Sequence, residues 1–238
     1  MAAVTGLLIW QAVAQSGLVA AYLLPMPGAV AGRWLVLAHN GVLWHHTAMT
    51  LTEALLGFGA AFLVGGGLGY AIARAPMLDQ VFGPYVAATQ AMPMVALAPL
   101  VVVWFGLGLL SKVLICAMIV FFPMLVNTVA GLRSIDRTLL DAAQSEGATA
   151  WQRLWTVEAP LGLRTLLGGV KMGLTLAMTG AVVGEFVAAD AGLGYLMNLA
   201  RTAYDAPMVF AAALTMAGVA IAGYLIISVL ERALITWD

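Results

Sequence analysis

Apolar residues occur in long stretches along this chain, and charged residues interrupt them only at wide intervals. The stretches without a charged residue cover 1–32, 34–52, 54–73, 80–111, 113–132 and 206–230. A helix needs about 20 mainly apolar residues to cross a lipid bilayer. Prolines, glycines and polar residues divide the chain further, so we predict spans at 4–24, 51–73, 84–107, 112–132, 164–188 and 207–230. The pattern indicates an all-α membrane protein whose six transmembrane helices form a single domain over 1–238.

The composition agrees with a membrane protein and excludes other classes. Of the 238 residues, 63% are hydrophobic and 9% are charged, whereas soluble domains average about 45–50% and about 25%. The net charge of −1 provides no field that would attract nucleic acid. The one cysteine, Cys116, excludes an internal disulfide and a cysteine-based metal cluster. His45 and His46 are adjacent with no third ligand nearby, so we expect no metal site.

The basic residues predict an orientation in the membrane. Residues 29–46 mix an arginine, three histidines and two tryptophans, which is typical of an amphipathic helix at the interface, here on the outer side. Six spans place both termini on one side, and the excess of basic residues there predicts that this side is cytoplasmic. The inner residues are then Arg74, Arg133, Arg137, Arg153, Arg164 and Arg232, and the outer ones are Arg33, Lys112 and Arg201. The first 24 residues lack a positively charged start, so we expect a retained helix rather than a signal peptide.

Small residues recur at every fourth position in two predicted spans. The two stripes are Gly57, Ala61, Gly65, Gly69 in the second span and Gly169, Gly173, Ala177, Ala181 in the fifth. This spacing lets helix backbones approach closely, so we expect close helix packing along both stripes.

Polar residues within the spans are candidates for function, because burying them in a membrane is costly. Glu185 continues the stripe of the fifth span; it either braces the turn that follows, through backbone amides such as that of Gly194, or lies at the mouth of a pathway. We expect Lys171 to extend towards the cytosol. Pro93 should bend its helix, and the residues beside it are pathway candidates, with core packing as the alternative reading. The pathway candidates are Gln90, Met92, Met94 and Glu185.

The one sizeable charged section, 133–163, follows the fourth span. Ser134 or Asp136 can cap a first helix, Gly147 interrupts it, and a second short helix should cover 148–157 and end at Pro160. Two tryptophans in the second helix are residue types that favour anchoring in a partner's pocket. The alternative is a solvated linker that folds back on the bundle.

This section resembles the EAA signature of bacterial ABC importer permeases. Asp141-Ala142-Ala143, three residues, Gly147, nine residues and then Val157-Glu158-Ala159-Pro160 reproduce the family's spacing, with Asp141 in place of glutamate. Motifs elsewhere, including Trp104-Phe105-Gly106 and Gly192-Leu193-Gly194-Tyr195, resemble the nitrate, sulfonate and taurine branch of that family.

The resemblance implies a type I ABC importer permease fold, with a core over about 47–231 and a cytoplasmic coupling helix within residues 133–163, called the coupling segment below. It implies two ATP-binding subunits, a second permease copy in a homodimer, and an extracytoplasmic binding protein that delivers the solute. By the same resemblance the residues that dock on the ATPase are Asp141, Ala142, Ala143, Gly147, Trp151 and Pro160. The chain would lie in a bacterial inner membrane as a multi-pass protein among its lipids.

No nucleotide-binding motif of the GxxxxGK[ST] type occurs, so we expect no ATP hydrolysis, no catalytic residue and no cofactor in this chain; ATP and magnesium would bind to the partner. The solute expected from the resemblance is a small organic molecule, such as a pyrimidine precursor of thiamine, riboflavin or a sulfonate, or else nitrate. A stand-alone secondary carrier is the alternative function, although no repeated halves with broken helices are evident.

Overall fold

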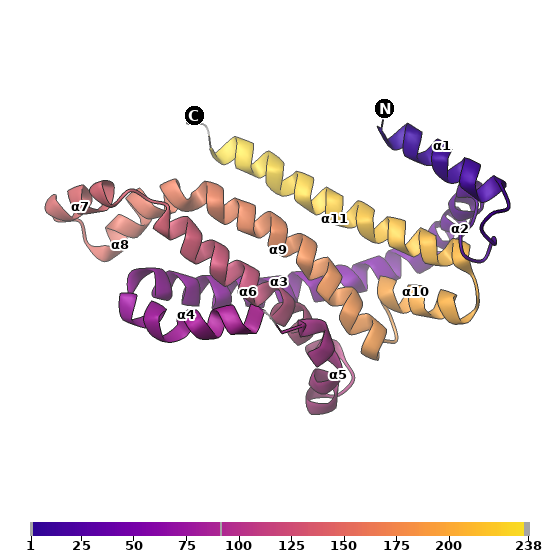
Figure 1. The fold of residues 1–238 in the computed structure, drawn as a ribbon, viewed down its shortest axis with the longest axis horizontal. Helices are drawn as coiled ribbons and strands as arrows, with labels where there is room; N and C mark the ends of the chain where they lie inside the picture. The colour runs from indigo at the N-terminus through magenta and orange to yellow at the C-terminus, as the bar shows by residue number, and fades with distance from the viewer. Residues whose placement is uncertain (1, 91, 236–238) are drawn as a thin grey trace.

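The structure, a computed structural model, describes residues 2–90 and 92–235 and consists of helices joined by short connections (Figure 1). The helices are α1 (Ala2–Gln15), α2 (Pro27–His39), α3 (Val42–Arg74), α4 (Pro76–Gln90), α5 (Met94–Phe105), α6 (Leu109–Arg133), α7 (Arg137–Ser145), α8 (Ala150–Arg153), α9 (Ala159–Ala188), α10 (Leu193–Thr202) and α11 (Ala206–Leu234). A π-helical turn, Leu154–Glu158, joins α8 to α9. The described residues include no β-strand, and the all-α prediction is confirmed.

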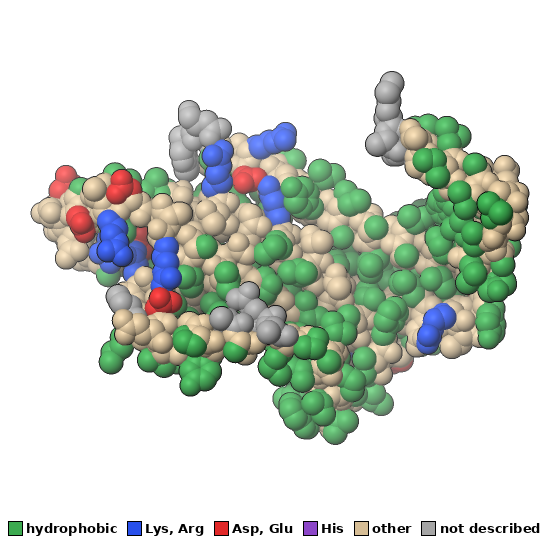
Figure 2. Space-filling model, in the orientation of Figure 1, with side chains coloured by type: hydrophobic (Ala, Val, Ile, Leu, Met, Phe, Trp, Pro, Cys, Tyr) green, Lys and Arg blue, Asp and Glu red, His purple; other side chains and the backbone are tan. Residues whose placement is uncertain are grey.

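Four helices are long and apolar enough to cross a membrane. They are α3, α6, α11 and the continuous helix Ala150–Ala188, which contains α8 and α9. Each of them includes one predicted span, namely 51–73, 112–132, 207–230 and 164–188. Hydrophobic side chains cover much of the visible surface between the two ends of the molecule, as expected for a surface in contact with lipid (Figure 2).

The predicted span at 84–107 is not a single helix. It is divided between α4 and α5, with Pro93 in an extended conformation immediately before α5. Proline has no N–H to donate and disfavours a helical conformation in the residue before it, so the helix ends at this point. Pro84 and Pro99 lie inside α4 and α5, where the helices continue through them. The sequence predicted a bend at Pro93, and the structure shows a complete break.

The predicted span at 4–24 is shorter than expected. The helix α1 ends at Gln15, and its 14 residues extend about 21 Å, less than the roughly 30 Å of a bilayer's hydrocarbon core. The indole Nε1 of Trp10 donates a hydrogen bond to the carbonyl oxygen of Pro25 at 3.0 Å. The residues after α1 therefore fold back beside it instead of extending the helix.

The predicted interfacial segment, 29–46, is divided between two helices. Gly41 precedes α3 with φ of +75°, a left-handed conformation that glycine adopts without steric cost. The helix α2 packs against α11, where the indole Nε1 of Trp34 donates to Thr215 Oγ1 at 2.9 Å.

The helices α3, α6 and α9 form the core of the bundle through their small residues. A Cβ atom added at Gly65 would lie 2.9 Å from the carbonyl oxygen of Phe121, and one at Gly69 would lie 2.8 Å from that of Leu125. The stripe residues of α9 are also buried, and both predictions of close packing are confirmed. The charged coupling segment, with α7 and α8, and the helix α10 lie towards opposite ends of this core (Figure 1).

Candidate functional site

The coupling segment forms a helical pair at one end of the molecule, where α7 and α8 extend beyond the bundle (Figure 1). Asp136 caps α7, because its Oδ1 accepts a hydrogen bond from the backbone N–H of Thr138 at 2.9 Å. Hydrogen bonds from Thr138 lower the pKa of this carboxyl, since they favour its charged form. Asp136 is thus one of the two caps that the sequence predicted.

Gly147 makes the turn between α7 and α8. Its φ is +81°, and its N–H donates to the carbonyl oxygen of Gln144 at 3.0 Å. Nothing lies within 4 Å of the place that a Cβ atom would occupy. The backbone conformation, rather than the space around it, is therefore what favours glycine here.

The second helix of the segment starts with a capping box and does not stop where expected. Thr149 Oγ1 accepts a hydrogen bond from the Gln152 N–H, and the Gln152 side chain accepts one from the Thr149 N–H. The prediction that Pro160 ends this helix is wrong. Pro160 lies in the first turn of α9, where a proline is tolerated, and the chain stays helical from α8 through the π-helical turn into α9. The coupling segment is therefore continuous with a membrane-spanning helix.

The exposed face of the coupling segment carries an acidic residue, small residues and aromatic rings. Asp141 and Ala142 are exposed, and Ala143 is half-buried. The side chains of Trp151 and Trp155 are 68% and 58% exposed, and their rings meet edge to face with centroids 5.6 Å apart. Large exposed aromatic rings at a projecting end favour contact with another protein.

Glu158 ties this segment to the bundle. Its side chain is fully buried, and its Oε1 accepts a hydrogen bond from Arg153 Nε at 3.0 Å. The same carboxylate forms an ion pair with Arg74, the last residue of α3. Residues five apart do not face each other on an α-helix, so the π-helical turn is what lets Arg153 reach Glu158. Glu158 was identified from the sequence only as part of the motif, and neither of its two arginine partners was predicted.

A cavity of about 600 Å³ lies where the chain breaks between α4 and α5, and we call it the break cavity. Two of the predicted pathway residues, Met92 and Met94, line it; the side chain of Gln90 lies outside the described residues. Its remaining lining residues are Thr89, Val95, Ile119, Phe122, Pro123, Val126, Asn127 and Met172. None of these lining side chains carries a charge.

Glu185 lies apart from the break cavity, in a buried network near the end of α9 that leads into α10. Its carboxylate accepts hydrogen bonds from Thr50 Oγ1 at 2.6 Å and from the backbone N–H of Gly194 at 2.5 Å. Thr50 Oγ1 also accepts from the Leu193 N–H at 2.8 Å. These bonds join α3, α9 and the start of α10, and they match the interpretation of Glu185 as a brace.

An ion pair next to this network was missed by the sequence reasoning. Lys112, expected to face the outside, is only 3% exposed, and its Nζ lies 2.5 Å from Glu53 Oε1. Glu53 is fully buried as well. Its position inside an otherwise apolar stretch was a signal that a partner would be needed. Lys171, which was expected to extend towards the cytosol, forms a second ion pair, with Glu231 near the end of α11.

Comparison with known proteins identifies the family. Residues 57–236 match the binding-protein-dependent transport system inner membrane component family. The chain is 48% identical to the riboflavin transport system permease protein RibX of Chloroflexus aurantiacus over 98% of this chain and 87% of that protein. It is 32% identical to the taurine transport system permease protein TauC of Escherichia coli over 97% of this chain and 86% of that protein. The fold is similar to that of a chain of the inward-facing MetNI methionine ABC transporter, with a TM-score of 0.70 at 18% identity over 78% of this chain and 93% of that one. The chain therefore belongs to the binding-protein-dependent transport system inner membrane components, the permeases of ABC importers.

Proposed function

We propose that this permease imports its solute when a separate ATP-binding subunit acts on the coupling segment. The observation that carries the proposal is the projecting pair α7 and α8, with its exposed tryptophans and its glycine turn at Gly147. An exposed aromatic surface on a projecting helical pair is suited to contact with a partner protein. A permease that is moved by a separate ATP-binding subunit needs such a surface, because the two proteins must be in direct contact.

The contacts of the coupling segment support a mechanical role. A push on α8 moves α9 directly, because the helix is continuous from Ala150 to Ala188. The same push moves the end of α3 through the ion pairs that Glu158 makes with Arg153 and Arg74. The helices α3, α6 and α9 all pack against one another. One contact surface can therefore reorient most of the core.

Membership of an ABC importer family supports an assembly of several subunits. We propose two ATP-binding subunits, which bind ATP and magnesium, a second copy of this permease, and an extracytoplasmic protein that delivers the solute. The coupling segment and both termini would lie in the cytoplasm, where most of the arginines also fall. The α10 end would then face the binding protein.

For the solute, we propose an uncharged or weakly charged organic molecule with a planar ring, for which riboflavin is the first probe. The break cavity has a volume in the range of small-molecule sites, and it offers methionines, one phenylalanine and the polar side chains of Thr89 and Asn127. A sulfonate or nitrate ion finds no basic side chain there. The relative at 48% identity is named as a riboflavin permease.

Reconstitution in proteoliposomes tests the proposal. The permease is combined with its ATP-binding subunit and binding protein, and ATP-dependent uptake of labelled riboflavin is compared with that of taurine. Gly147→Val should abolish uptake, because a β-branched residue resists φ of +81°. Gly168→Val in α9, where a Cβ atom meets nothing within 4 Å, is the control and should retain uptake. Uptake that needs no ATP, or that survives Gly147→Val, would contradict the proposal and favour a secondary carrier.

A further inference from the structure

A polar cavity of about 650 Å³ lies under the coupling segment, between the ends of α3 and α6 and the helices α4 and α7. Four of its lining residues are arginines: Arg74, Arg133, Arg137 and Arg153. Lys and Arg side chains gather at this end of the molecule in Figure 2. Arginine presents a planar fork of N–H donors that fits the oxygens of a phosphate group.

The arginines are incompletely neutralised. Arg74 and Arg153 share the single carboxylate of Glu158, and Arg133 pairs with Asp79 at 2.9 Å. Arg137 forms no ion pair within the described part of the chain, and the Nε of Arg74 is buried there without a hydrogen-bond partner. The cavity therefore retains unused N–H donors and positive charge, although Asp141 also borders it.

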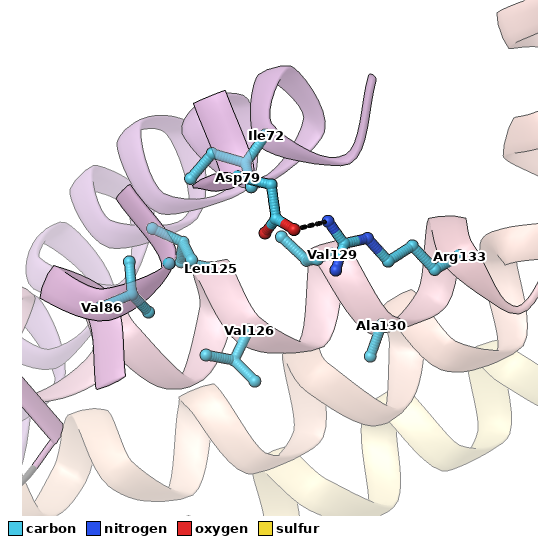
Figure 3. A pocket seen from close by; sticks show the side chains of 9 residues that line it. Ile72, Asp79, Val86, Leu125, Val126, Val129, Ala130 and Arg133 are labelled. Atoms are coloured by element: carbon cyan, nitrogen blue, oxygen red, sulfur yellow. Dashed lines mark ion pairs between the residues drawn. The ribbon is translucent and has the colours of Figure 1, made fainter. Parts of the chain in front are cut away.

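An apolar cleft continues from this cavity towards the middle of the bundle. Asp79 and Arg133 line both spaces, and the cleft, of about 280 Å³, runs between α4 and α6. Figure 3 shows the ion pair of Asp79 and Arg133 at one end of the cleft and apolar side chains along the rest. From Arg133 to Leu125 the wall formed by α6 extends about 12 Å. The combined space is polar and basic at one end and apolar along its length.

We infer that the cavity and the cleft together bind an anionic phospholipid. Its phosphate contacts the arginines, Arg137 and Arg74 above all, and one acyl chain lies in the cleft between α4 and α6. Basic pockets between membrane helices on the cytoplasmic side are suited to anionic headgroups. A free phosphate ion would use only the polar end, whereas the apolar cleft buries hydrocarbon. A lipid bound here touches α3, α4, α6 and α7, so it stabilises the coupling segment against the bundle.

Native mass spectrometry of the full-length chain in mild detergent tests the inference. Phosphatidylglycerol and phosphatidylcholine are added separately, and the bound fraction is measured with and without inorganic phosphate. The wild type should retain phosphatidylglycerol preferentially. Arg137→Gln should weaken that binding about tenfold, the scale of one hydrogen bond to a charged group. Arg232→Gln, an exposed arginine near the end of α11 and outside both spaces, is the control and should bind like the wild type.

The cleft needs a test that leaves the charges in place. Ala130→Phe fills the cleft beside α6 and should lower the binding of phosphatidylglycerol, while Arg137 remains intact. Thermal unfolding of each variant checks that it is folded. Equal retention of the two lipids, unchanged binding in Ala130→Phe, or displacement of the lipid by millimolar phosphate would overturn the inference, the last by indicating a site for free phosphate.

Discussion

Replacing Glu158 with glutamine tests how the coupling segment is held against the bundle. The carboxylate is fully buried and serves two arginines, whose side chains are 25% exposed for Arg74 and 22% exposed for Arg153. Breaking a buried ion pair typically costs about 3–5 kcal/mol. The partial exposure of both arginines reduces that cost, because water can solvate them after the change, so we expect about 2 kcal/mol here.

Hydrogen–deuterium exchange measures this loss locally. A cost of about 2 kcal/mol increases opening of α8 and the following π-helical turn roughly 30-fold. Glu146→Gln is the matched control, because Glu146 is exposed at the end of α7 and forms no ion pair with any described side chain. In the assembled transporter, Glu158→Gln should also lower uptake more than ATP hydrolysis. Equal exchange rates of residues 150–158 in Glu158→Gln, Glu146→Gln and the wild type would show that Glu158 does not hold the coupling segment in place.

Three further predictions concern the bundle and the cap of α7. Gly69→Ala should lower the free energy of unfolding by about 1–3 kcal/mol, because the added Cβ would lie 2.8 Å from the carbonyl oxygen of Leu125 in α6. Gly67→Ala, whose Cβ would have nothing within 4 Å, should be neutral or stabilising. Equal melting temperatures of the two variants would contradict this. Lys112→Met should lower the free energy of unfolding by about 3–5 kcal/mol, because it leaves Glu53 buried without its partner. The double variant Lys112→Met, Glu53→Met should regain most of this stability, as measured by thermal unfolding. Hydrogen bonds lower the pKa of Asp136 from its ordinary 3.8. The cap therefore stabilises α7 fully above pH 3.8, and this stabilisation is lost as the pH falls through the lower pKa of the folded state. Amide exchange in α7 that is unchanged on acidification would contradict this.

The sequence was sufficient for features that depend on neighbours along the chain. The glycine and alanine stripes follow from helical spacing alone, and the structure places them at close contacts. The cap at Asp136 and the turn at Gly147 are equally local. The four long spans also follow directly from the apolar stretches.

Features that depend on tertiary packing were missed. Glu53 and Lys112 belong to different helices, and nothing near either residue in the sequence indicates the other. The partners of Glu158 needed both the end of α3 and a π-helical turn, which has no simple sequence signal. Prolines were ambiguous as well. Pro93 accompanies a complete break, whereas Pro160, expected to end the short helix before it, lies in the first turn of α9 within a helix that continues past it.

Site-directed cross-linking in native membranes tests whether an ATP-binding subunit docks on the coupling segment. Cys116 is fully buried, so a cysteine placed at exposed Ala142 in α7 provides the accessible thiol, and one at exposed Thr202 in α10 marks the opposite end. Cross-linked products are identified by mass spectrometry. We expect an ATP-binding subunit attached to Ala142→Cys and none attached to Thr202→Cys. An ATP-binding subunit captured only at Thr202→Cys, or at neither position, would contradict docking on the coupling segment.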